Sequence, residues 1–382
     1  VLHEMPDLPE GVVNYPEASA RKFALLRLAS ERFTSAASAV QQSAFSDFCE
    51  QHGWWLDDYA RFMVLREVGH EQAWSAWEPD LVRRDPTTMT RWEASHTQEI
   101  CFQKHLQFFF FTQWRQLKIY ANQRGVKLVG DIPIYVGLDS AEVWSQPDLF
   151  VLDRQTYAPQ FVAGVPPDYF SETGQRWGNP LYRWWDENKR PVEEVYGWWS
   201  QRFRAIFALV DIVRIDHFRG FEAYWAIPTE EETAINGQWM PGPGAELFAR
   251  VQAELNELPV IAEDLGVITL EVDALRRQFG FPGMKVLQFA FGGDARNSYL
   301  PHNYTDPRSV VYTGTHDNDT VQGWFHTLSA QDQSVVLRYL GRTEATEVHW
   351  DLIRLALSST ASLAIIPLQD ILGLGSEARM NT

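Results

Sequence analysis

Carboxylate side chains recur at the ends of short apolar runs in this 382-residue sequence. The six acidic residues in such positions are Asp131, Asp216, Glu263, Asp294, Asp317 and Asp370. Carboxyl groups can act as nucleophiles, as general acids or bases, or as oxygen ligands of Mg²⁺ or Ca²⁺. If the runs are parallel strands, their carboxyl ends share one face of the fold. We therefore expect six carboxylates around one mouth.

The sequence is also rich in aromatic residues, with 16 Trp, 13 Tyr and 23 Phe. Many stand beside Gly and Pro in residues 163–185, a segment that could cover such a site. Aromatic rings pack against the apolar C–H faces of sugars, whereas carboxylates and amides bind the hydroxyl groups. Cleavage of a glycosidic bond needs two carboxyl groups that flank it. The combination favours carbohydrate chemistry over zinc chemistry, since no His or Cys cluster has ligand spacing.

Alternating strands and helices must position these groups. The apolar runs are residues 126–136, 209–218, 258–266, 284–294, 309–317 and 361–370. Helix-like stretches separate most of them, for example residues 245–255 and 270–280. Such alternation predicts repeated β/α units around a parallel sheet, and we expect an α/β protein with a (β/α)8 TIM barrel and inserted subdomains.

A closed barrel needs eight strands, and the sequence offers six strong candidates. Residues 52–65 are a weaker candidate for an earlier strand. The chain opens at Val1 and stops after "SEARMNT". We therefore expect a fragment that lacks its N-terminal strand and its C-terminal tail.

Changes in composition along the chain predict four regions. Residues 1–125 should be mainly helical, an insertion with early barrel elements, and residues 126–143 should hold a barrel strand. Residues 144–205 are rich in Pro, Gly and aromatic residues and too long for an ordinary loop, so we expect a subdomain over the active site. Residues 206–382 would form the catalytic barrel core.

The charge and composition argue against several classes of partner. The net charge is −17 and the isoelectric point is near 5.0, so nucleic acid and anionic membranes would be repelled. No apolar run reaches membrane-spanning length. Only Cys49 and Cys101 are present, which favours a reducing compartment, either the cytoplasm or the plastid stroma of a plant or alga.

Three motifs follow one another at successive strand ends: "VRIDHFRG", "IAEDLG" and "YTGTHDNDT". Five longer segments accompany them: "GDIPIYVGLDSAEVW", "AGVPPDYFSETGQRWGNP", "FPGMKVLQFAF", "YLPHNY" and "LAIIPLQDILGLGSEARMNT". From about residue 45 onward, the chain resembles amylomaltases, the 4-α-glucanotransferases (disproportionating enzymes) of glycoside hydrolase family 77 in the α-amylase superfamily. The resemblance implies a retaining transferase that acts on maltooligosaccharides and α-1,4-glucans, with no metal and no cofactor.

The resemblance implies roles for three carboxylates. Asp216 would be the nucleophile that attacks an anomeric carbon, and Glu263 would be the general acid and base. Asp317 would bind sugar hydroxyls and favour the distorted ring of the transition state. Because Glu263 must carry a proton at neutral pH, burial or a like charge must raise its pKa. Asp264 should point to the other side of its strand and act as a structural partner.

Other residues would bind substrate or support these carboxylates. Arg214, two residues before Asp216 on one strand face, would hold that carboxylate ionised, although a purely structural Arg–Asp pair is the alternative. His217 and His316 would donate hydrogen bonds to sugar hydroxyls. Asp131 would support the site or contact the substrate.

The loop "PPDYFSETGQRWGNP" resembles the one that covers acceptor sugars. Its candidate subsite residues are Tyr169, Phe170, Gln175 and Trp177. Packing within the loop itself is the alternative role for these side chains.

The sequence thus predicts a 4-α-glucanotransferase (EC 2.4.1.25) that moves α-1,4-glucan segments between maltooligosaccharides or starch-type glucans by a retaining double displacement. An α-1,4-glucan hydrolase of the α-amylase superfamily would use the same carboxylates, so only the loop motif favours transfer. An inactive glucan-binding protein on the same barrel is the alternative of another class.

Overall fold

The computed structural model describes residues 13–69, 71–168, 171–379 and 381, and the chain divides into two compact units. The first comprises Val1–Val126, Val136–Phe161 and Gly178–Arg183, and the second comprises Lys127–Tyr135, Val162–Trp177 and Trp184–Thr382. The four regions expected from the sequence remain a prediction.

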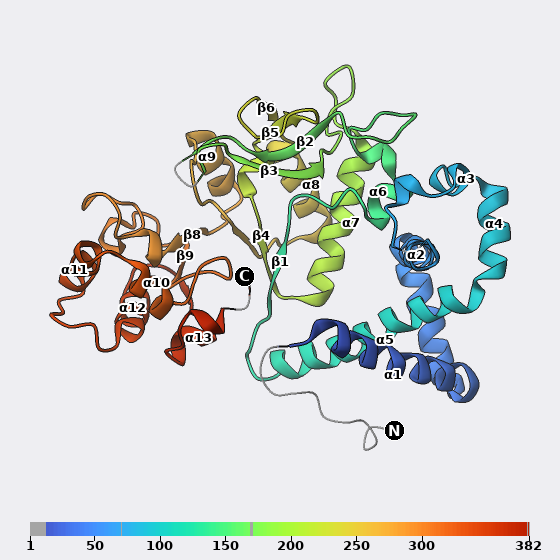
Figure 1. Ribbon diagram of the computed structural model, residues 1–382, viewed down its shortest axis with the longest axis horizontal. Coiled ribbons are helices and arrows are strands. Elements are labelled where there is room, and N and C mark those ends of the chain that lie inside the picture. The colour runs from blue at the N-terminus through green and yellow to red at the C-terminus, as the bar shows by residue number, and fades with distance from the viewer. Residues whose placement is uncertain (1–12, 70, 169–170, 380, 382) are drawn as a thin grey trace. The chain divides into compact units, whose positions relative to one another are not determined.

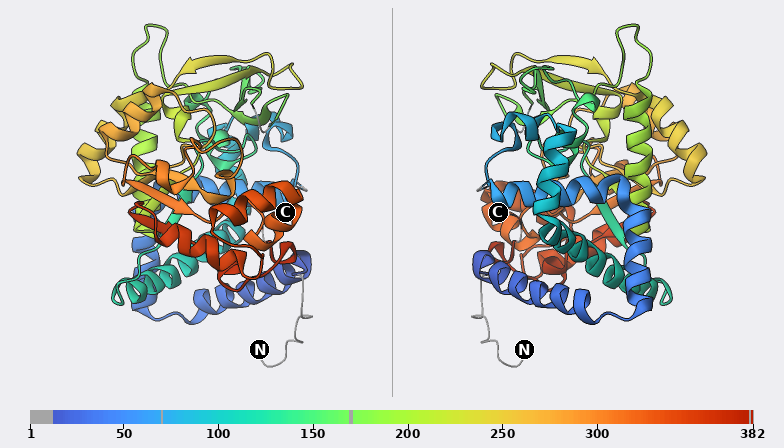
Figure 2. Two further views of the ribbon diagram at one scale, coloured as in Figure 1. Left: turned by 90° about the vertical axis from the view of Figure 1, so that its left-hand side faces the viewer. Right: turned by 90° about the vertical axis from the view of Figure 1, so that its right-hand side faces the viewer.

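Helices dominate the described part of the first unit (Figures 1 and 2). They are α1 (Tyr15–Ala36), α2 (Ala39–Val68), α3 (Pro79–Val82), α4 (Pro86–Ser95), α5 (Thr97–Asn122) and α6 (Ala141–Ser145). A capping box starts α2, in which the side chains of Ser38 and Gln41 satisfy each other's backbone N–H groups. Residues 52–65, the weaker strand candidate, lie inside α2, so that prediction is wrong.

Aromatic side chains hold the long helices of this unit together. The rings of Phe33 and Phe45 lie 5.8 Å apart, and each also contacts Phe108 on α5. His105 of α5 is buried against them, with its Nδ1 2.7 Å from the hydroxyl of Ser30. The helical periodicity of these segments therefore reflects packing within the unit.

All six apolar runs expected to be strands form parallel strands of the second unit. They are β1 (Val129–Ile132), β4 (Ile212–Ile215), β7 (Val260–Ala262), β8 (Gly283–Val286), β9 (Ser309–Tyr312) and β10 (Leu363–Ile365). One sheet has the order β1-β4-β7, and a second has the order β10-β9-β8. The N–H of Ala262 donates a 2.9 Å hydrogen bond to the carbonyl of Pro282, from β7 to the residue before β8. Strand order in space thus follows strand order in the chain.

Helices separate most of these strands as expected, and the last helix follows β10. They are α7 (Glu193–Leu209), α8 (Gly244–Leu255), α9 (Leu270–Gln278), α10 (Val321–Thr327), α11 (Ala330–Tyr339), α12 (Val348–Leu357) and α13 (Leu368–Ile371). The helices expected over residues 245–255 and 270–280 are confirmed as α8 and α9. The α/β class is confirmed, whereas the sheets are small and open.

A further sheet has the order β3-β2-β5-β6, with strands β2 (Phe161–Val165), β3 (Gln175–Pro180), β5 (Ala223–Pro228) and β6 (Gln238–Pro241). The strands β5 and β6 pair antiparallel, with Trp225 opposite Trp239. These two rings lie 5.1 Å apart in an edge-to-face arrangement, which stabilises a cross-strand pair.

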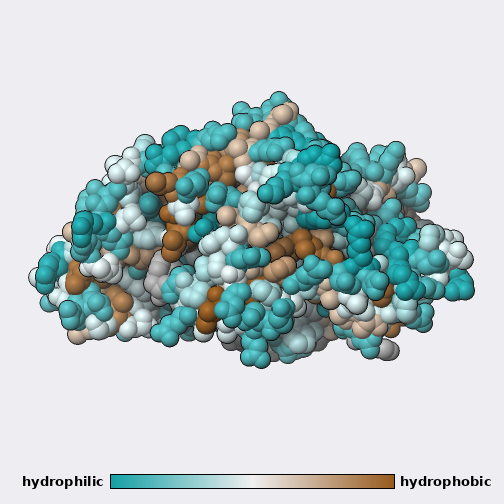
Figure 3. Space-filling view, turned by 90° about the horizontal axis from the view of Figure 1, so that it is seen from above, coloured by the Kyte–Doolittle hydropathy of each residue, from teal (hydrophilic) through white to brown (hydrophobic). Residues whose placement is uncertain are grey.

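Hydrophilic residues cover most of the face seen in Figure 3, with smaller hydrophobic patches between them. Within the described residues, every helix is either too short or too polar to cross a membrane.

Candidate active site

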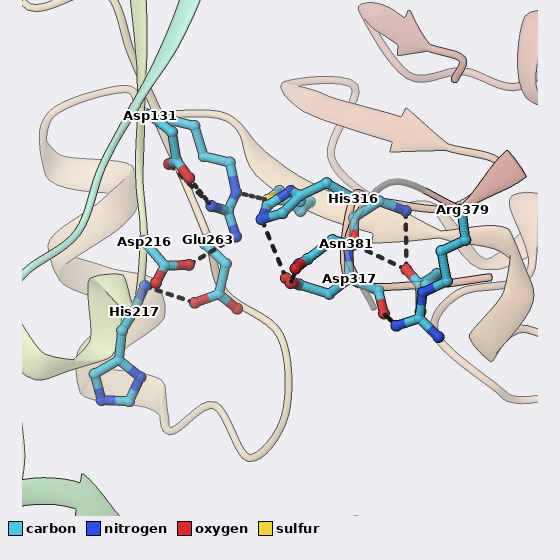
Figure 4. Close-up of polar contacts among 12 residues, drawn as sticks. Asp131, Asp216, His217, Glu263, His316, Asp317, Arg379 and Asn381 are labelled. Carbon is cyan, nitrogen blue, oxygen red and sulfur yellow. Dashed lines mark hydrogen bonds and ion pairs between the residues drawn. The ribbon is translucent and has the colours of Figure 1, made fainter. Parts of the chain in front are cut away.

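Arg214 connects the side chains of three residues from neighbouring strand segments, two of which, Asp131 and Asp216, are labelled in Figure 4. The register of β1 and β4 places Asp131 opposite Arg214. Arg214 Nη1 donates hydrogen bonds of 2.9 and 2.8 Å to the two carboxylate oxygens of Asp131, and Nη2 donates one of 2.8 Å to Asp216 Oδ1. Its Nε lies 3.4 Å from the sulfur of Met284 on β8. Because the guanidinium is planar and only 8% of the residue is exposed, these contacts fix the two carboxylates relative to each other.

The carboxylates around Arg214 favour its charged form. Burial lowers the pKa of Arg214, but Asp131, Asp216 and Glu263 together outweigh it, so the net shift of the pKa is upward. Burial raises the pKa of Asp131, as does the charge of Asp216, while Arg214 and His316 oppose this rise. The site is thus a group of carboxylates around one buried cation.

Glu263 follows β7 and lies beside Asp216 (Figure 4). Two backbone N–H groups hold its carboxylate, that of Leu265 at 2.8 Å from Oε1 and that of His217 at 2.8 Å from Oε2. Burial raises the pKa of Glu263 to about 7, and the charge of Asp216 adds to this rise, while the two amides and Arg214 oppose it. The raised pKa agrees with the expectation from the sequence, and it leaves a large protonated fraction at neutral pH.

His217 adopts a left-handed backbone conformation, with φ at 52°. Its ring meets that of Trp177 edge to face at 4.8 Å. Burial lowers the pKa of His217 to about 4, so the imidazole is neutral at physiological pH. Within the described residues its Nε2 is buried and has no hydrogen-bond partner. Trp177 in turn donates from Nε1 to the side-chain oxygen of Gln175 at 3.0 Å, which joins three expected subsite residues in one cluster.

His316 and Asp317 follow β9, and in Figure 4 they lie to one side of Asp216 and Glu263. His316 Nε2 is 3.4 Å from Asp317 Oδ2, and both side chains are exposed. Asn381 donates to Asp317 Oδ1 at 3.1 Å, and Arg379 donates to the backbone carbonyl of Asp317 at 2.7 Å. Arg379 and Asn381 therefore contact the third expected carboxylate residue.

A cavity of about 390 Å³ lies between these groups and includes both Arg214 and His316 in its lining. The ends of β9 and β10 supply most of the lining, together with Arg379 and Asn381. Asp216, Glu263 and Asp317 are not among its lining residues. Polar groups from both sides of the site thus face one space.

Two of the six carboxylates expected around the mouth, Asp294 and Asp370, form ion pairs or hydrogen bonds with other parts of the chain. Asp294 lies eight positions beyond the end of β8 and forms a surface ion pair of 2.7 Å with Arg296. Asp370 lies in α13, where its buried carboxylate accepts hydrogen bonds from the hydroxyl of Thr313 and the N–H of Val321. Asp294 therefore lies away from the end of β8, because its apolar run continues past that strand, whereas Asp370 is a buried group bonded to Thr313, the residue after β9.

The other expected residues are placed as follows. Asp264 accepts a 2.7 Å hydrogen bond from the N–H of Met284 and lies 3.3 Å from Arg276, which confirms it as a structural partner. Tyr169 and Phe170 lie outside the described residues. No group of three or more His, Cys, Asp and Glu side chains in the described ranges is arranged to hold a metal ion.

Sequence reasoning missed several residues that contact the site. Arg379 and Asn381 belong to the noted motif "RMNT", which could have indicated them. Nothing in the sequence around Met284 indicates its contact with Arg214, since that contact depends on how β7 and β8 lie next to each other. Arg219 belongs to "VRIDHFRG" but was given no role.

Comparisons with known proteins agree with the motifs. The family described as 4-alpha-glucanotransferase, glycoside hydrolase family 77, matches residues 2–382. A 4-alpha-glucanotransferase from Synechocystis sp. is 49% identical over 382 residues, which cover 100% of this chain and 75% of that protein. Another from Thermus thermophilus is 48% identical over 384 residues and covers 99% of this chain and 76% of that protein.

A solved structure shows the same similarity in three dimensions. The amylomaltase from Streptococcus agalactiae, in complex with acarbose, has a TM-score of 0.90 and 36% identity, and the match covers 98% of this chain and 74% of that one. The resemblance recognised in the motifs is thereby confirmed. The chain belongs to the 4-alpha-glucanotransferase family, glycoside hydrolase family 77.

Proposed function

We propose that the chain transfers α-1,4-glucan segments between maltooligosaccharides or starch-type glucans by a retaining double displacement that needs no cofactor. The names of its relatives support this activity. The Streptococcus agalactiae neighbour was solved in complex with acarbose, which supports a carbohydrate ligand for this chain.

One observation carries the proposal: two neighbouring carboxyl groups stand in different environments. Asp216 accepts a hydrogen bond from the buried cation Arg214, whereas burial raises the pKa of Glu263 to about 7. A retaining mechanism needs this difference, because one carboxylate must be ionised to attack and the other must hold a proton to give.

In the first step, a carboxylate oxygen of Asp216 attacks the anomeric carbon of the donor. The glycosidic C–O bond breaks, and Glu263 donates its proton to the departing oxygen. The product is a glycosyl ester on Asp216 and a shortened glucan. Arg214 keeps the nucleophile in place through its hydrogen bond at 2.8 Å.

In the second step, the ionised Glu263 removes the proton from the 4-hydroxyl of an acceptor glucan. The acceptor oxygen displaces Asp216 from the anomeric carbon and forms a new α-1,4 bond, so two inversions retain the configuration. Glu263 ends protonated, ready for the next donor.

The remaining expected residues would serve the sugar subsites. Asp317 and His316 would bind hydroxyls of the ring that distorts, and Trp177 with Gln175 would meet the acceptor. The neutral His217 supports a role near that subsite, because its ring lies edge to face with Trp177.

We also propose that the six parallel strands are an arc of a (β/α)8 barrel. Two features support this: strand order follows chain order, and the outer strands β1 and β10 carry exposed apolar side chains, Val129 at 44% and Leu363 at 40%. Further strands of a closed barrel would cover such edges. We place the enzyme in the cytoplasm, or in the plastid stroma of a plant or alga, which agrees with the free thiols of Cys49 and Cys101.

Incubation with pure maltotriose tests the function. A transferase should give glucose and a ladder of longer maltooligosaccharides, with almost no rise in total reducing ends, because each bond broken is replaced by one formed. A rise in proportion to the bonds cleaved would favour the hydrolase. Binding of maltooligosaccharides without any product would favour the inactive binding protein. The Asp216→Ala variant, prepared in parallel, controls for contaminating activity.

A further inference from the structure

The carboxylate of Glu263 depends on two separate loops for its position. The N–H of His217 comes from the loop after β4, and the N–H of Leu265 comes from the loop after β7. Both donors are backbone groups, so the distance between them is set by the paths of the two loops. The N–H of Phe218 donates a 3.1 Å hydrogen bond to the carbonyl of Glu263, which joins the two loops where they leave the strands. A contact further along the loops would add to this constraint.

Arg219 makes such a contact. It lies in the short helix η4 (Phe218–Phe221), two residues after His217, and its Nη1 donates a 2.5 Å hydrogen bond to the carbonyl of Val267, two residues after Leu265. The turn that presents this carbonyl depends on Gly266, whose φ of +86° favours glycine. Arg219 therefore bonds the same two loops that supply the amide donors.

The guanidinium of Arg219 is itself held in place. Its centre lies 4.0 Å from the centroid of the Trp239 ring on β6. Its Nε is buried and has no hydrogen-bond partner within the described residues, so the carbonyl of Val267 and the face of Trp239 are the contacts that orient it. A cation over an indole ring is attracted by the π-electrons, most strongly when water is excluded.

We propose that Arg219, held against Trp239, is a positioning residue that joins the two loops and thereby sets the geometry of Glu263. The inference rests on the proposed role of Glu263 as acid and base and extends it to a group that does not touch the substrate. A misplacement of about 1 Å far from the chemistry can lower a rate by roughly 100-fold.

The proposal predicts a direction for the pH profile. The groups that face Glu263 are Asp216 and Arg214 from the β4 side and the two amides, and the amides lower its pKa because they favour the charged form. Arg219 itself faces Glu222, whose charge opposes the effect of burial on the pKa of Arg219. If the loops separate, the amides weaken and the pKa of Glu263 rises. The alkaline limb of the activity profile should then move to higher pH.

The test compares Arg219→Ala, Arg219→Lys and Trp239→Ala with Arg296→Ala, a control whose side chain is exposed and pairs only with the neighbouring Asp294 in the described contacts. Amide hydrogen exchange of His217 and Leu265 is measured by NMR and needs no activity. With maltotriose, kcat, KM and the alkaline limb are measured for each variant.

For Arg219→Ala we expect faster exchange at both amides, a fall in kcat of roughly 10- to 100-fold with little change in KM, and an alkaline limb at higher pH. Arg219→Lys should restore part of kcat, and Trp239→Ala should resemble a milder Arg219→Ala. If Arg219→Ala does not fold, the other two variants decide. The proposal would be overturned if Arg219→Ala left both the hydrogen exchange of the two amides and the alkaline limb of the pH profile as in the wild type. An inactive wild type would overturn the proposed function alone, since exchange would still report whether Arg219 joins the loops.

Discussion

Arg214 Nη2, on β4, donates a 2.8 Å hydrogen bond to Oδ1 of Asp216, the residue that follows this strand. The other terminal nitrogen of the same guanidinium binds both carboxylate oxygens of Asp131. One rigid, charged group therefore sets the position of Asp216, and its planar geometry matters as much as its charge.

Replacing Arg214 by Lys should separate these two contributions. The ammonium keeps the positive charge but lacks the planar fork whose two nitrogens bond Asp131 and Asp216 separately, so we expect kcat to fall by roughly 100-fold while the protein stays folded. Steady-state kinetics with maltotriose, together with a thermal melt, measure both effects. Activity close to that of the wild type would mean that charge alone is sufficient.

Asp216→Ala should abolish transfer, because it removes the atom that bonds to the anomeric carbon. We expect a loss of at least about 10³-fold in kcat with a nearly unchanged circular dichroism spectrum. Asp294→Ala is the matched control, since the described contacts of that carboxylate are all with Arg296 at the surface, an ion pair with its guanidinium and a hydrogen bond from its N–H. The assignment fails if the two variants retain similar activity.

Glu263→Gln should change how stability depends on pH. The pKa of Glu263 is about 7 in the folded protein against an ordinary 4.5, so between these values the folded state binds more protons than the unfolded chain. Its contribution is fully present below about pH 4.5 and is lost as the pH rises through about 7. The loss is at most about 1.4 kcal/mol in the free energy of unfolding for each pH unit of this window.

Gln cannot ionise, so the Tm of the Glu263→Gln variant minus that of the wild type should increase from about pH 5 to about pH 8 and then level off. Thermal melts across this range measure it, with Glu257→Gln, an exposed residue just before β7, as the control. A difference in Tm that stays constant with pH would show that the carboxyl of Glu263 titrates normally.

The strands and the grouping of Asp131, Arg214 and Asp216 near their ends could be predicted from the sequence because the signals are local. The run ending in "RIDH" combines apolar residues that bury with an Arg and an Asp spaced to share one face, and β4 has this arrangement. Asp370 could not be placed in this way, because its buried bonds to Thr313 and Val321 depend on how α13 packs. Residues 52–65 contain apolar runs that resemble a strand. They nevertheless form part of the 30-residue helix α2, whose start is stabilised by the capping box at Ser38.

Contacts between residues of different strands and loops could not be predicted from the sequence either, because they depend on tertiary packing. Nothing in the type of Met284 indicates that its sulfur meets Arg214 Nε, and the bond from Arg219 to the carbonyl of Val267 involves a backbone atom that any residue could supply. Such contacts depend on register and loop shape.

Trp177→Ala should shift the reaction from transfer towards hydrolysis. A transferase must position its acceptor well, and oriented groups reach effective molarities of about 10⁵ M or more, far above the concentration of water. Loss of the ring that meets His217 should weaken acceptor binding and let water reach the glycosyl enzyme. The ratio of reducing ends formed to glucose released from maltotriose measures the shift.

Trp350→Ala is the control for this prediction, since Trp350 on α12 is 37% exposed and Trp177 is 38% exposed. We expect the control to keep the transfer ratio of the wild type. If both variants hydrolyse equally, or neither does, Trp177 has no part in acceptor use.

The most direct measurement of the double displacement is the location of the covalent intermediate. The Glu263→Gln variant can still form the glycosyl ester from a maltosyl donor with an activated leaving group, but it lacks the base that would resolve it, so the adduct should accumulate. Peptide mass spectrometry after rapid acid quenching should find the added sugar on Asp216. A sugar on Asp131, Asp317 or any other carboxylate would contradict the roles assigned here, as would the absence of any adduct while the variant still turns over the donor.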